Sequence, residues 1–391
     1  MSITPQQIDY SLMAILAGEP DWEDGLGFDD STWQVWLKHA KKHGMAELIY
    51  WSWQDNVPTT VPYWVVEKLQ QRYITTLARN RLMLLELDEI LKGLGELQIE
   101  VILLKGAVFS RTLYEDIGIR PMSDLDILLH KADIEKAVEL LSQRGYYEPV
   151  LHQRDMLKKE VSHDIHLRQI NLPHLDVEVH WLLGGGEGFR QKVDMDWFWQ
   201  TRMQFGDGQP GVYVLSPTAT VLYLCAHLAF QHGIGMSTLL WYVDIARFLE
   251  KYSDEINWEE LIQQAAVFQW NAAVFYTLSV VQENFGVQLP DTLLRRLQQQ
   301  ISIPEERFVR EKMVTLDTNA ALAWSGFKQL SWSGRVKDVF SRVFPSLEFM
   351  KARYGFENNT RAMLGYPYRW AELINKMVFH LRKRWNRKQA C

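Results

Sequence analysis

The stretch that begins at Asp124 most constrains how this chain can fold, because two acids open an apolar run. Asp124 and Asp126 are separated by a single residue, and the alternate positions are apolar: Leu125, Ile127 and Leu129. If the run is a β-strand, both carboxylates point to one face and the apolar side chains enter the core. Adjacent carboxylates repel unless a cation lies between them, and a hard divalent ion suits oxygen ligands. The alternative is a strand that leaves a turn with two solvated acids.

A candidate phosphate site precedes the acid pair. Residues 99–104 form a short apolar segment that runs into Lys105 and Gly106, and residues 108–114 can form a helix. A strand, a glycine turn and a helix N-terminus present unpaired backbone N–H groups and a favourable dipole to an anion. Lys105 adds a positive charge at the end of the strand. An ordinary turn is the simpler explanation of the Lys-Gly pair alone.

A third acid occurs in an alternating segment, residues 175–181. Asp176, Glu178 and His180 share one face of the expected strand, and the other face is apolar. Such alternation also describes any half-buried strand with one solvated face. If this strand lies beside the acid pair, however, Glu178 completes a site with three carboxylates.

Three motifs together resemble the nucleotidyltransferase superfamily, and more narrowly its bacterial group of uncharacterised nucleotidyltransferase family proteins. The motifs are Lys105-Gly106, Arg120-Pro121-Met122-Ser123-Asp124-Leu125-Asp126 and Val177-Glu178-Val179-His180-Trp181. The resemblance extends over most of the chain and includes residues 217–232, 241–246 and 345–369.

The resemblance implies that three acids are both catalytic and metal-binding: Asp124, Asp126 and Glu178. The expected cofactor is Mg²⁺ or Mn²⁺, and the expected donor is a nucleoside triphosphate, with ATP as the default. One ion would bind the triphosphate, and the other would activate an acceptor hydroxyl for in-line attack on the α-phosphorus, so that pyrophosphate leaves. The acceptor stays open: a small molecule, a protein side chain or an RNA end.

The expected phosphate-binding residues are Lys105, Gly106, Arg120, Ser123 and His180. Arg120 could equally be an exposed loop arginine, and His180 could be a base or a partner of Glu178. Ala107 departs from the family pattern, which usually has a small polar residue there whose hydroxyl helps to hold a phosphate. The departure leaves room for a nucleotide-binding or regulatory module without turnover. A helical interaction protein in a biosynthetic complex is a second alternative.

The hydrophobic patterns predict an α+β fold in three parts. Residues 1–97 are expected to form an N-terminal helical arm, residues 98–185 a nucleotidyltransferase core with a small mixed sheet, and residues 186–391 a C-terminal all-helical domain. Within the last part, Ser216-Pro217 and Asn257 are expected to start helices.

Two further groups of histidine and aspartate residues are candidate sites. His227 and Asp244 could line the acceptor cleft, or they could form a buried hydrogen-bonded pair. His227 and His232 are five residues apart, which is about 500° of α-helix, so the two rings are not expected to share a face or bind zinc. His163-Asp164 is similar to the His-Asp pair of metal phosphohydrolases, but the surrounding pattern predicts a strand rather than their helix.

Composition favours a cytoplasmic protein. The chain has 391 residues, two cysteines and a net charge of −6, so neither a disulfide framework nor a surface built for nucleic acid is expected. No basic N-terminal region precedes an apolar stretch, and no run is long enough to be a transmembrane segment. The basic segment from Lys376 onwards could bind a membrane or nucleic acid, or be a solvated helix end. The oligomeric state stays open.

Overall fold

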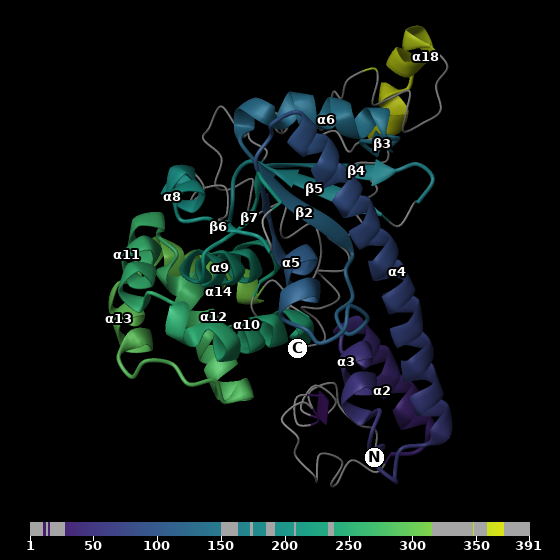
Figure 1. Ribbon diagram of the computed structural model, residues 1–391, viewed down its shortest axis with the longest axis vertical. Helices are drawn as coiled ribbons and strands as arrows, with labels where there is room; N and C mark the ends of the chain where they lie inside the picture. Colours follow the sequence, from purple (N-terminus) through teal and green to yellow (C-terminus); the bar gives the residue numbers. More distant parts are fainter. Residues whose placement is uncertain are drawn as a thin grey trace. The chain divides into compact units, whose positions relative to one another are not determined.

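The fold of the chain is given by a computed structural model (Figure 1). It describes residues 28–149, 163–172, 175–184, 192–206, 209–233, 238–314 and 358–370, with Ser11, Leu12, Ile15 and Leu347. Residues 1–147 and 163–322 form one compact unit, and residues 148–162 and 323–391 form another. The second unit contains helix α18 (Asn359–Leu364). The basic segment from Lys376 onwards lies outside the described residues.

Among the described residues of the first unit, seven strands form a mixed sheet in the order β3-β4-β5-β2-β1-β7-β6 (Figure 1). The strands are β1 (Val101–Leu103), β2 (Asp124–Leu129), β3 (Tyr146–Tyr147), β4 (Asp164–Gln169), β5 (Asp176–His180), β6 (Met203–Gln204) and β7 (Val212–Val214). The pairs β2–β5 and β1–β7 are parallel, and the other pairs are antiparallel. The predicted α+β class is confirmed.

The alternation of side chains along the strands divides the interior into two hydrophobic clusters. Ile102 and Leu128 belong to a large cluster shared with helices α9 (Pro217–Ala226), α10 (Leu239–Tyr252) and α12 (Asn271–Phe285). Leu103, Ile127 and Val179 belong to a smaller cluster with the C-terminal half of α4 (Tyr63–Glu96) and with α6 (Ile134–Gln143). Because Asp126 alternates with Ile127, its carboxylate lies on the face of the larger cluster.

The helices before the sheet pack through aromatic side chains. They are α2 (Asp30–Lys42), α3 (Ala46–Trp53) and α4. The rings of Trp36 and Trp53 stack with their centroids 6.0 Å apart, and Trp33 meets Trp36 edge-on. All three side chains are buried, so the tryptophans near the N-terminus contribute packing area to the same cluster as the C-terminal helices.

The helices after the sheet begin where the capping residues predict. The Ser216 side chain accepts from the N–H of Ala219, with Pro217 as the first helical residue, and Asn257 accepts from the N–H of Glu260. Besides α9, α10 and α12, this part contains α8 (Met195–Gln200), the π-helix η3 (His227–His232), α11 (Trp258–Phe268), α13 (Leu293–Gln299) and α14 (Ile303–Val314). The short strands β6 and β7 join the sheet from beyond residue 185, and the three-part division of the chain stays a prediction.

In the described ranges, no helix has both the length and the apolar character that crossing a bilayer requires.

The N-cap of α2 gives a testable pH dependence. Hydrogen bonds from the Thr32 side chain and N–H, and from Ser31, lower the pKa of Asp29 from 3.8 to about 2. Because the folded pKa is depressed, this stabilisation is present above pH 3.8 and is lost as the pH falls through about 2. We expect Asp29→Ala to lower the melting temperature at neutral pH, and Asp29→Asn, which still caps, to lower it less. Equal melting temperatures for Asp29→Ala and the unmodified protein in thermal unfolding would contradict the assignment.

Candidate active site

The parallel pairing of β2 with β5 determines the geometry of the site. In this register Asp126 lies opposite Glu178, and Asp124 lies opposite Asp176. Side chains at paired positions of neighbouring strands point to the same face and lie side by side. The Asp126 side chain is only 3% exposed, whereas that of Glu178 is 25% exposed. One acid is therefore buried at the base of the site, and the other reaches solvent.

Two cationic side chains compensate the buried charge of Asp126. Lys105 Nζ lies 2.8 Å from Asp126 Oδ1, and His180 Nε2 lies 2.9 Å from the same oxygen. Burial alone would raise the pKa of Asp126, but Lys105 and His180 outweigh burial and hold that pKa well below its usual range. Burial disfavours the charged form of His180, yet hydrogen bonds to Asp126 and Glu178 raise the pKa of His180 to about 9. The acid is thus ionised between two positive groups.

Negative charge remains in excess at Asp124. Burial, followed by the charges of Asp126 and Glu178, raises the pKa of the Asp124 carboxyl to about 6. Asp126, Glu178 and His180 form a group of possible metal ligands whose ligand atoms lie within 4.8 Å of one another. Asp124 is not a member of that group, although it lies two residues before Asp126 on β2. The assignment of all three acids as metal ligands and catalytic residues stays a prediction.

The turn that precedes the acid strand differs in detail from the predicted one. Helix α5 (Lys105–Thr112) begins three residues earlier than expected, and the residue with positive φ is Lys105 (41°) rather than Gly106. A Cβ at Gly106 would lie 2.8 Å from Nη1 of Arg120 and 3.2 Å from Cγ of Met122, so glycine allows a close approach between α5 and that loop. The N–H of Leu104 donates to the Asp126 carbonyl, which ties the turn to β2.

The loop before β2 is held by a buried ion pair. Arg120 Nε donates to Asp244 Oδ1 at 2.9 Å and Nη2 donates to Oδ2 at 2.7 Å, while the Tyr114 hydroxyl donates to Oδ1 at 2.7 Å. The Asp244 carboxylate of α10 is therefore shared by Arg120 and Tyr114. Asp244 pairs with these two residues and not with His227. Ser123 hydrogen-bonds to Asp124. Roles for Arg120 and Ser123 at phosphate, and for Asp244 at the acceptor, stay predictions.

The expectation that the His227 and His232 rings do not share a face was wrong, because the segment is a π-helix. Their Nε2 atoms lie 3.1 Å apart and the ring centroids 4.7 Å apart. A π-helix closes i→i+5 hydrogen bonds, so residues five apart lie one above the other, whereas α-helical geometry would separate them. Burial, followed by the charge of Lys105, holds the pKa of His227 well below its usual value. A neutral imidazole therefore lies near the site, and its place in an acceptor cleft stays a prediction.

Tyr223 and a neighbouring cavity were not found by sequence reasoning. The ring of Tyr223, on α9, lies under Lys105 with Nζ 5.9 Å from its centroid. Both residues line a cavity of about 350 Å³. Every residue of α9 after Pro217 is buried, so the local pattern shows no face that could have marked Tyr223 as different from its neighbours.

A family of known proteins matches the part of the chain that carries the site. A family described as "Uncharacterised nucleotidyltransferase" matches residues 29–286, a range that contains the sheet, the acids and the helices α9 to α12. No curated protein and no solved structure matches the chain.

The buried ion pair makes a stability prediction. The Arg120 and Asp244 side chains are 7% and 3% exposed, so Asp244→Ala would leave an uncompensated buried charge and cost about 3–5 kcal/mol of unfolding free energy. The double variant Arg120→Met/Asp244→Leu should recover much of this loss. Arg296→Ala is a matched control, because Arg296 pairs with Glu259 at the surface and its removal should cost little. Denaturant unfolding measures all three, and equal losses for Asp244→Ala and Arg296→Ala would contradict the analysis.

Proposed function

Because this chain belongs to the uncharacterised nucleotidyltransferase family, we propose that it transfers a nucleoside monophosphate from a nucleoside triphosphate to an acceptor hydroxyl and releases pyrophosphate. The observation that carries the proposal is the pairing of Asp126 with Glu178 on neighbouring strands, beside the Lys105 turn. Transfer of this kind depends on positioning and on charge compensation more than on covalent chemistry by the protein.

The acids fit a hard divalent cation. Asp126 and Glu178 offer carboxylate oxygens on the same face of the sheet, and the raised pKa of Asp124, caused by burial and by these two neighbours, signals negative charge that a cation would relieve. Mg²⁺ and Mn²⁺ prefer such oxygen ligands. When bound, these ions supply the charge that stabilises the attacking and leaving oxygens.

Lys105 and the first turn of α5 are proposed to hold the triphosphate. The first N–H groups of a helix have no partner inside the helix, and Lys105 places a cation at the same point. His180 stays protonated at neutral pH while it is paired with Asp126, which supports a role as a charge partner of phosphate or of the acids rather than as a base. Ala107 is fully buried and supplies no hydroxyl, so Lys105 or Ser123 is proposed to make that contact instead.

Glu178 is the proposed acceptor of the hydroxyl proton. It is more exposed than Asp126 and His180, the other two members of its group of possible ligands, and it lies beside the buried Asp126. The attacking oxygen forms a bond to the α-phosphorus, its proton passes to the Glu178 carboxylate, and the bond to pyrophosphate breaks.

The cavity beside Lys105 is the proposed acceptor pocket. Its volume, about 350 Å³, is within the range of small-molecule sites. Most of its lining side chains are apolar, among them Val108, Phe109, Leu224 and Phe248. Such a lining suits an acceptor with an apolar body whose hydroxyl lies at the Lys105 end. A nucleotide-binding module without turnover is the second candidate, and the missing hydroxyl at Ala107 is what favours it.

The test of the chemistry is pyrophosphate release from labelled nucleoside triphosphates in the presence of Mg²⁺ and cell extract. We expect Asp126→Asn, which keeps shape and removes charge, to lower the rate by about 100-fold or more. Asp176→Asn is the matched control, because Asp176 lies on the same face of β5 but is engaged by Arg168 at 2.8 Å. Magnesium-dependent nucleotide binding without pyrophosphate release would favour the second candidate, and an unchanged rate in Asp126→Asn would refute the proposed site.

The acceptor pocket is tested by filling it. Leu224→Trp places a larger side chain in the cavity and should lower labelling of the acceptor on the order of 10- to 100-fold, because a displaced acceptor loses its alignment with the α-phosphorus. Binding of nucleotide and Mg²⁺, measured by calorimetry, should not change. Leu224→Met, of similar volume, is the control. Equal labelling in both variants would show that the acceptor binds elsewhere.

A further inference from the structure

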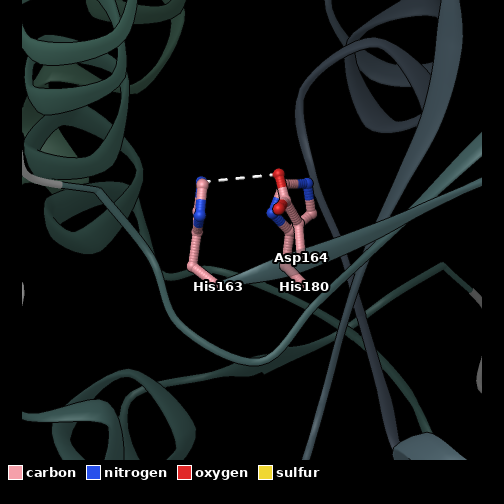
Figure 2. A group of neighbouring side chains, drawn as sticks. All are labelled: His163, Asp164 and His180. Atoms are coloured by element: carbon pink, nitrogen blue, oxygen red, sulfur yellow. Dashed lines mark ion pairs between the residues drawn. The ribbon is translucent and has the colours of Figure 1, made fainter. Parts of the chain in front are cut away.

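Three metal-ligating side chains gather at the ends of β4 and β5, beside the acids already described. Asp164 begins β4 and lies opposite His180 in the antiparallel register, and His163 directly precedes it. His163 Nε2 is 3.5 Å from Asp164 Oδ2, and the rings of His163 and His180 are 6.0 Å apart. Ligand atoms of all three residues lie within 4.8 Å of one another. Figure 2 shows the three side chains pointing to the same side of the strands.

The hydrogen bond between His180 and Asp126 determines which nitrogen of His180 is left for this group. His180 Nε2 contacts Asp126 Oδ1 at 2.9 Å, so Nδ1 is the nitrogen that remains, and an ion bound there would displace the Nδ1 proton of the charged ring. Metal-binding histidines usually donate their second ring N–H to a carboxylate, which holds the ring and selects its tautomer. Asp126 is placed to hold the His180 ring in this way, beside His163 and Asp164.

The ligand chemistry of this second group differs from that of the acid pair. Two imidazole nitrogens and one carboxylate oxygen suit a first-row transition ion such as Zn²⁺, whereas Mg²⁺ prefers oxygen ligands. Gln231 Nε2, on η3, lies 3.4 Å from His163 Nε2 as a hydrogen-bond donor to that ring, not as a fourth ligand. The His163 and Asp164 side chains are 15% and 27% exposed, so an ion can reach them.

We infer that His163, Asp164 and His180 form a binding site for a divalent transition ion, adjacent to the proposed nucleotidyl-transfer site and sharing His180 with it. Occupancy would hold the His180 ring in place against Asp126 and would join the ends of β4 and β5. The inference stands on the arrangement of these side chains and does not depend on nucleotidyl transfer.

The test is a titration of the full-length protein with Co²⁺ in saturating Mg²⁺. Binding is monitored by visible absorption, which reports on the ligands of Co²⁺. We expect one Co²⁺ that Mg²⁺ does not displace. His163→Ala and Asp164→Asn should each weaken Co²⁺ binding by about 10-fold or more. His166→Ala is the matched control, since His166 lies on the same strand but pairs with Asp176, and it should bind Co²⁺ as the unmodified protein does.

Two further variants keep the outcome clear. Circular dichroism checks folding, and His163→Gln replaces His163→Ala if the latter unfolds. Glu178→Gln should lose pyrophosphate release and retain Co²⁺, which separates failure of the transfer proposal from failure of this one. Displacement of all Co²⁺ by Mg²⁺, or equal Co²⁺ affinity in His163→Ala and His166→Ala, would overturn the inference.

Discussion

The pairing of two carboxylates across the parallel strands β2 and β5 is the constraint on which the rest of the site depends. Asp126 cannot be buried beside Glu178 as an anion unless positive charge lies close to it. Lys105 and His180 supply that charge from two different elements, the turn after β1 and the end of β5. The arrangement that compensates the buried negative charge also brings together the groups proposed to bind a cation and a phosphate.

The sheet carries this cluster between two hydrophobic interiors. One face packs on α4 and α6, and the other, which bears the acids, packs on the helices after residue 215. The Arg120–Asp244 pair links the loop before β2 to α10, and Tyr223 of α9 lies under Lys105. Helices distant in sequence therefore border the acids, and the cavity beside Lys105 arises between these elements.

Much of the fold and part of the site could be predicted because their signals are local. Alternation at 124–129 and 175–181 predicted strands with one polar face, and Ser216 and Asn257 predicted helix starts by capping. The prediction failed for His227 and His232, because nothing local distinguishes a π-helical turn from an α-helical one. It also missed the cavity and Tyr223, since a helix that is buried on all sides has no pattern to interpret.

The sequence by itself determined the chemistry that is possible here: two acids on one strand face, a third acid on another strand, and a lysine at a strand-to-helix turn. These follow from the period-two geometry of a strand and need no knowledge of what surrounds it. Only the tertiary structure decided which groups meet: that Glu178 and His180 join Asp126 in one group of possible ligands, that Arg120 faces Asp244, and that His163 and Asp164 gather beside His180. The reason is that strand register and helix packing bring together residues far apart in the chain. Register and packing in turn depend on the volumes and charges of side chains throughout the interior.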